Sequence, residues 1–242
     1  MSNDFIDFYS PIPNTHYDHF FKEVQYNGKI LTEAERKELL SRLEETISEF
    51  SEGLPNLFEY LEESRNLYDE YHKIVNTLNS VTLFTISTMI DCLVAGKYFM
   101  LADGDYDRRF MRGKMMVILN EGFKRLYGFD EKTKKKSEWY RLLPIMRYFP
   151  DIIQFQYQKL TNLLKEQAYS SSWWREERNL ETHLDTEELY RSRQVEIIES
   201  KVMMDSMKLF STLLAINQFL SNVNQCLSNY LIIKYRRDEI SR

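Results

Sequence analysis

Residues that interrupt helices are scarce in this chain. Its 242 residues include seven Gly and five Pro, against 43 % hydrophobic and 29 % charged residues. A β-sandwich or barrel needs a turn every few residues, so this scarcity excludes those folds and favours long helices. The balance of hydrophobic and charged residues is that of a globular protein and excludes a chain disordered throughout.

Metal and cofactor motifs are also missing. Gly-rich phosphate loops, nucleophile elbows and zinc-finger spacings do not occur. His16 and His19 flank Asp18, but without a third placed ligand they do not form a zinc site. The two cysteines, Cys92 and Cys226, lie in apolar helical patterns, as small buried side chains do. The sequence therefore predicts no metal and no cofactor.

An excess of basic residues is absent as well, since the formal net charge is −5. Proteins that rely on non-specific phosphate contacts usually have a basic face, so any such contact would be local. The densest basic cluster is Lys132–Lys136, followed by Arg108, Arg109 and Arg112, and by Arg236 and Arg237. Each cluster is either a solvated loop or helix end, or a contact for an RNA backbone.

A long uncharged apolar run is also lacking. Residues 81–101 have the length of a membrane span, but they contain Asp91 and Lys97, which are costly at bilayer depth. We therefore expect a buried helix and no membrane association, with a satisfied core hydrogen bond at Asp91. The first ten residues contain Asp4 and Asp7 and no apolar run, so we expect a cytoplasmic protein.

Helical periodicity and capping residues divide the chain into expected elements. Residues 1–30 lack periodicity and predict an irregular arm, and Thr32 and Glu35 form a capping box at the next helix start. Further helices are expected over 55–101, with a bend or break near Asn79 and Ser80, over 108–127, and over 139–147, with Ser137 as its cap. Two more are expected over 151–169 and 185–236, the last with a kink or break. The prediction is an all-α four-helix bundle of two helical hairpins, with an additional N-terminal helix and an irregular arm. The arm and capping helix occupy residues 1–54 and the bundle residues 55–242, as one continuous globular domain.

The residues most suggestive of chemistry lie late in the chain, in the segment from Trp174 to His183. Arg178 is followed by Asn179 and, after three more residues, by His183. Cleavage of RNA by its own 2′-hydroxyl needs a base, an acid and a cation, and no metal. His can act as base or acid near neutrality, and an Arg fork can hold two phosphate oxygens. Arg178 and His183 are therefore the candidate catalytic pair, with Asn179, Glu177 and Trp174 as candidate auxiliary or RNA-binding residues.

A second copy of the pattern occurs earlier, where Arg65 and Asn66 are followed by His72. In a continuous helix these two residues would share one face, as an ordinary surface pair does. The later copy lies beside an expected helix start. Its alternative is a cluster in which Glu176, Glu177 and Glu181 pair with Arg175 and Arg178.

The Arg178-Asn179 and His183 pattern resembles the signature of the HEPN ribonucleases, an all-helical superfamily whose motif is Arg, four to six residues and His. In that superfamily the motif lies toward the end of the domain, by a helix start, so the resemblance favours this copy over Arg65 and His72. The resemblance implies a metal-independent endoribonuclease, a homodimer with Arg178 and His183 of both copies in one site, and a 2′,3′-cyclic phosphate product. It also implies a toxin or phage-defence role and a neutralising protein partner. The alternative is a non-catalytic helical module for dimerisation, or for binding a partner or RNA.

Overall fold

The computed structural model describes residues 32–64, 69–102, 105–170 and 199–240, and every regular element within these ranges is an α-helix. The all-α prediction is confirmed. In chain order the helices are α2 (Glu33–Glu52), α3 (Leu54–Glu63), α4 (Glu70–Leu101), α5 (Asp105–Leu126), α6 (Glu131–Lys134), α7 (Glu138–Met146), α8 (Asp151–Ser170) and α11 (Glu199–Ile240).

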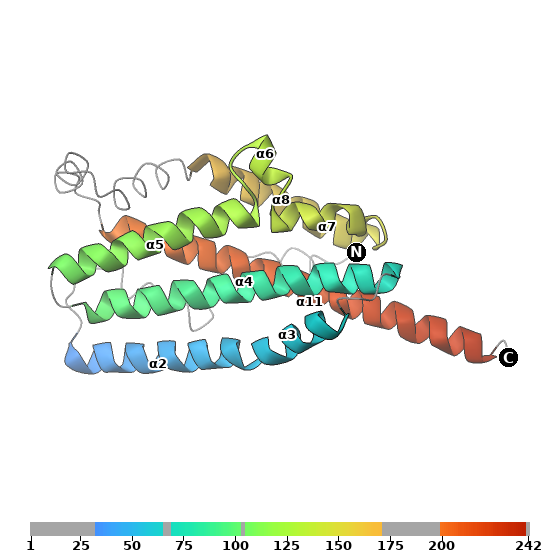
Figure 1. Cartoon of the computed structure of the whole chain (residues 1–242), viewed down its shortest axis with the longest axis horizontal. Coiled ribbons are helices and arrows are strands. Elements are labelled where there is room, and N and C mark those ends of the chain that lie inside the picture. The colour runs from blue at the N-terminus through green and yellow to red at the C-terminus, as the bar shows by residue number, and fades with distance from the viewer. Residues whose placement is uncertain (1–31, 65–68, 103–104, 171–198, 241–242) are drawn as a thin grey trace, which may run out of the picture.

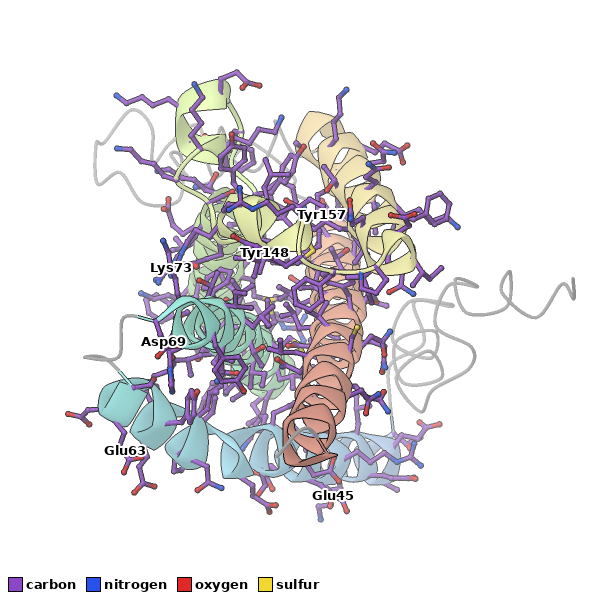
Figure 2. The ribbon with its side chains drawn as sticks, turned by 90° about the vertical axis from the view of Figure 1, so that its right-hand side faces the viewer. Glu45, Glu63, Asp69, Lys73, Tyr148 and Tyr157 are labelled. Carbon is purple, nitrogen blue, oxygen red and sulfur yellow. The ribbon has the colours of Figure 1, made fainter. Side chains whose placement is uncertain are left out.

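Three layers stack around the central helices (Figures 1 and 2). α4, α5 and α11 pack on one another in the middle, with α2 and α3 against α4 on one side. On the other side, α6, α7 and α8 cover α5, α11 and the start of α4. α4 and α5 run antiparallel, as predicted, and α11 runs beside both and extends beyond the start of α4 (Figure 1).

Two predicted caps are confirmed. The Glu35 backbone N–H donates to Thr32 Oγ1 over 3.3 Å, and the Thr32 N–H donates to the Glu35 carboxylate over 2.7 Å, which closes the capping box of α2. Ser137 begins α7 by accepting the Tyr140 N–H over 3.2 Å. In each case a side-chain oxygen satisfies an N–H that the first helical turn leaves without a partner.

The helix predicted over residues 55–101 is in fact two helices. α3 ends at Glu63, and Asp69 then starts α4 in extended backbone, accepting the His72 N–H over 3.0 Å. Asn79 and Ser80, where a bend was expected, lie inside α4. The prediction missed the break because Asp69 stands in an otherwise helical pattern, and its capping role depends on the backbone turning there.

The lysine-rich connection contains a helix that the prediction missed. Gly128 ends α5 with a φ of 86°, and a Cβ there would lie 2.4 Å from the Lys134 backbone nitrogen. Asp130 then forms a capping box with Thr133 and begins the four-residue helix α6. This helix is short and has no buried side chain, so its sequence lacks apolar periodicity.

The last predicted helix is present, but its expected start near Asp185 lies outside the described residues. α11 runs as a single 42-residue helix, so the break expected in it is wrong for the described part, and the alternative of a kink stays a prediction.

The core contains an aromatic group between α7, α8 and α11. Trp139 stacks on Tyr157, and both rings pack against Phe219. Trp139 Nε1 donates to Thr161 Oγ1 over 2.8 Å, and the Tyr157 hydroxyl donates to the Trp139 carbonyl over 3.1 Å. These contacts fix α7 by its inner face.

α4 passes through the centre of the fold, yet only part of it is covered. Tyr71–Leu101 is long and apolar enough to cross a membrane, and 44 % of its most apolar window is buried. Asp91 lies on the exposed side of α4, so the core hydrogen bond expected for it is wrong. Partial burial still raises the pKa of its carboxyl. Lys97 pairs with Glu44 of α2 over 2.5 Å.

Candidate functional site

The favoured catalytic residues fall outside the part of the chain that the structure describes. Trp174, Glu177, Arg178, Asn179 and His183 all belong to residues 171–198. Arg65 of the second motif is likewise outside the described residues, whereas His72 is inside.

The two described helices on either side of the favoured motif end and begin at different places along the molecule. α11 begins near the start of α5, and the last turn of α8 lies against α11 at Thr212, whereas α4 begins, with His72 in its first turn, at the other end (Figure 1). Gln167 Nε2 donates to Thr212 Oγ1 over 2.6 Å and ties the last turn of α8 to α11. Asp205 is buried in an early turn of α11 and pairs with Lys208 over 3.4 Å.

His72 lies in the first turn of α4 and is engaged by Asp69. One oxygen of the Asp69 carboxylate accepts the His72 N–H, and the other contacts His72 Nδ1. The His72 N–H bond, followed by the side-chain bond to His72, lowers the pKa of Asp69 below its ordinary value of 3.8. Such a pair can orient an imidazole for proton transfer, but here Asp69 also has the structural role of capping α4.

A second pair of hydrogen bonds joins α3 to α4 beside this cap. Ser64 Oγ donates to Asn76 Oδ1 over 2.6 Å, and Asn76 Nδ2 donates to the Ser64 carbonyl over 3.2 Å. Burial, followed by the nearby Tyr71 and Asp69, raises the pKa of Tyr60. The polar residues at this junction therefore hold two helices together, and structural bonds account for their arrangement.

Cys92 lines a cavity between α2, α4, α5 and α11. The cavity has a volume of about 20 Å³ and an almost wholly apolar lining that includes Gly96, Met115 and Met203. Burial, with a smaller contribution from Asp91, raises the pKa of the Cys92 thiol to about 12. A thiol in this state is neither a nucleophile nor a metal ligand at neutral pH, and a dry space of this size holds no organic ligand. Within the described ranges, no three His, Cys, Asp or Glu side chains gather to hold a metal ion.

The described residues include a charged surface with exposed rings on α6 and α7 and the residues next to them, which we call the basic–aromatic surface. It consists of Lys132, Lys135, Lys136, Tyr140, Arg147 and Tyr148, all of which are exposed. The lysines follow one another directly into α7, and Figure 2 shows Tyr148 in the outer layer that α6, α7 and α8 form.

The sequence identified the lysines of this surface but not Tyr140, Arg147 or Tyr148. Trp139 and Leu142 are buried, which leaves the opposite side of α7 exposed. The signal available in the sequence was the spacing of Tyr140 and Arg147, which puts them two turns apart on one side of a helix.

Comparison of the chain with protein-family models, with curated proteins and with solved structures found no match.

Proposed function

We propose that this chain is a metal-independent endoribonuclease of HEPN type, in which Arg178 and His183 cleave RNA and Asn179 assists. One observation carries the proposal: the Arg178-Asn179 and His183 pattern occurs in an all-helical chain, between α8 and α11. The competing pattern is weaker, because capping of α4 accounts for His72 and its partner Asp69.

The proposed reaction needs only groups that these side chains supply. His183 accepts the proton of the 2′-hydroxyl as that oxygen attacks the adjacent phosphorus, and the P–O5′ bond breaks. Arg178 stabilises the charge that develops on the phosphate oxygens. Of the two products, one ends in a 2′,3′-cyclic phosphate and the other in a free 5′-hydroxyl, which takes up a proton from a second acid. The resemblance implies that this acid is His183 of a second copy of the chain, so we propose a homodimer.

The test is cleavage of total RNA by purified protein in EDTA. We expect wild type to produce fragments with 2′,3′-cyclic phosphate ends, and His183→Ala to produce fewer than one hundredth as many. A drop of 10²–10⁴-fold is typical when a general acid–base residue is lost. His72→Ala is the matched control, since it removes a histidine from the other motif and should retain activity.

Other outcomes would count against the proposal. An inactive wild-type protein, or fragments produced equally by His183→Ala, would reject the enzyme. Loss of activity in His72→Ala alone, with the protein still folded, would transfer the chemistry to the second motif.

The second candidate function is a non-catalytic helical module that binds a protein partner. It is supported by exposed apolar side chains on neighbouring helices: Tyr98 and Leu101 on α4, and Phe110 on α5, which is 63 % exposed. A neutralising protein partner of the ribonuclease could use the same side chains. The RNA assay separates the two functions, because a pure binding module leaves RNA intact.

A further inference from the structure

We propose that the basic–aromatic surface of α6 and α7 binds single-stranded RNA through its phosphates and bases. This inference rests on the proposed function, because it takes the ligand to be the RNA that the ribonuclease cleaves. It assigns a binding surface to residues far along the chain from Arg178 and His183.

Positive charge is concentrated in this part of the molecule. Residues 124–166 contain ten Lys or Arg and five Asp or Glu, a formal charge of +5 in a chain whose total is −5. α6 and α7, which carry the surface, form one outer layer with α8 (Figure 2). A local excess of this kind attracts a polyanion even where the whole protein is acidic.

The cations of the surface are available to a ligand. No described carboxylate forms an ion pair with Lys132, Lys135, Lys136 or Arg147. Lys134 differs, since it pairs with Glu131 over 3.6 Å and lies over the Tyr127 ring. Four cations without carboxylate partners are suited to contact phosphates.

The acidic residue within α7 is hidden, whereas Glu131 of α6 is 84 % exposed and pairs with Lys134. Glu138 is the one carboxylate in residues 137–150, and its side chain is only 9 % exposed. It pairs with Arg125 over 3.3 Å and with Arg141 over 2.6 Å. The outer side of α7 therefore presents no carboxylate that would repel a phosphate.

Exposed aromatic rings lie between the cations. Tyr140 is 40 % exposed and Tyr148 is 46 % exposed. Burial of a tyrosine ring is favourable, and these two rings are not buried within the protein. The Arg147 guanidinium lies over the Tyr148 ring, 4.7 Å from its centroid. Rings and arginine planes of this kind are the groups on which unpaired bases stack.

α7, which carries Tyr140 and ends beside Arg147 and Tyr148, is held in a fixed position. Ser137 caps its start, and the buried Trp139 anchors its inner face to Tyr157 and Thr161. Because the helix is anchored, little ordering is needed on binding, which favours affinity. A membrane surface would also attract the lysines, but exposed tyrosines among cations suit bases better than lipid chains.

The test is binding of a fluorescently labelled, 2′-O-methylated single-stranded RNA, followed by anisotropy at several salt concentrations. Methylation removes the attacking 2′-hydroxyl, so binding can be measured whether or not the protein cleaves RNA. We expect the triple variant Lys132→Gln/Lys135→Gln/Lys136→Gln to weaken binding. It should also make the slope of log K against log salt shallower by about 2, because each phosphate contact on a single strand contributes about 0.7 to that slope and three contacts are lost.

A matched control has the same change of net charge elsewhere. Lys37→Gln/Lys73→Gln/Lys114→Gln alters three exposed lysines on α2, α4 and α5, and its salt slope should equal that of wild type. Tyr140→Ala and Tyr148→Ala should each weaken binding on the order of 10-fold, as loss of a stacked base does, while the Phe variants keep wild-type affinity.

The proposal is overturned if both triple variants lose binding equally, or if the Tyr→Ala variants bind like wild type. It is also overturned if wild type ignores the RNA but binds phosphatidylserine vesicles. Cleavage of ordinary RNA without any effect of the surface variants on binding would reject this surface and leave the ribonuclease standing.

Discussion

The indole ring of Trp139 lies flat on the phenol ring of Tyr157, with ring centroids 4.7 Å apart and an angle of 11° between the planes. The pair joins α7 to α8, and Trp139 is 1 % exposed. We expect Trp139→Phe to lower the free energy of unfolding by roughly 1–3 kcal/mol, because it removes packed ring area and the bond to Thr161. Urea denaturation followed by circular dichroism measures this loss.

Two neighbouring variants act as controls for Trp139→Phe. Tyr157→Phe keeps the ring and loses one hydrogen bond, so it should cost about 1 kcal/mol. Tyr140→Ala changes an exposed ring on the same helix and should cost less than about 0.5 kcal/mol. Equal losses for Trp139→Phe and Tyr140→Ala would contradict the anchoring role of Trp139.

Two helix glycines should respond oppositely to alanine. Nothing lies within 4 Å of a Cβ placed at Gly96, which borders the small cavity, so Gly96→Ala should stabilise the protein by up to about 1 kcal/mol. A Cβ at Gly122 would approach Thr88 Cγ2 to 3.0 Å, because α5 and α4 pack closely there. Gly122→Ala should therefore gain nothing or destabilise.

Thermal unfolding of the two glycine variants gives the comparison. Combining Gly122→Ala with Thr88→Ser removes the crowding methyl and should restore part of the stability. If Gly122→Ala raises Tm as much as Gly96→Ala, the close approach of α4 and α5 is not a constraint.

A hydrogen bond in the core couples α4 to α11. Thr85 Oγ1 donates to Asn217 Oδ1 over 2.7 Å, and Thr85 is fully buried. Thr85→Val leaves the Asn217 oxygen without this donor and should cost about 1–3 kcal/mol. The double variant Thr85→Val/Asn217→Leu should cost less than the sum of the two single variants, since no polar group is then stranded. Strict additivity in this cycle would show that the two side chains do not interact.

The cap at Asp69 should make stability depend on pH. The folded-state pKa of Asp69 is lowered, so its contribution is fully present above the unfolded value near 3.8 and is lost as pH falls through the folded pKa. The difference in urea midpoint between wild type and Asp69→Asn should be positive at pH 7 and shrink toward pH 2. A difference that is constant across this range would exclude the carboxylate as its source.

Local chemistry made part of this fold predictable. Thr32 and Ser137 were recognised as caps because a cap and its partners lie within a few residues of one another. The break before Asp69 and the short helix α6 were missed, because no burial pattern marks either of them.

Only part of the basic–aromatic surface was predictable, because contacts between residues distant in sequence decide which side of α7 is exposed. Lys132–Lys136 stand out in the sequence by composition alone. The exposure of Tyr140 and Arg147 follows from which side of α7 is buried, and contacts of Trp139 with Tyr157 and Phe219 decide that. Such contacts join residues that are distant in sequence, so periodicity within α7 does not determine them.

The bond between Thr85 and Asn217 spans 132 residues of sequence, and this separation affects how the chain must fold. α4 and α5 can pair early as a local hairpin, but α11 reaches them only after that long intervening segment has been made. At ordinary rates of translation the wait is on the order of 10 s. During this time α4, the one described helix that is long and apolar enough to cross a membrane, lacks the helix α11 that covers it, so nascent chains should need chaperone protection at α4.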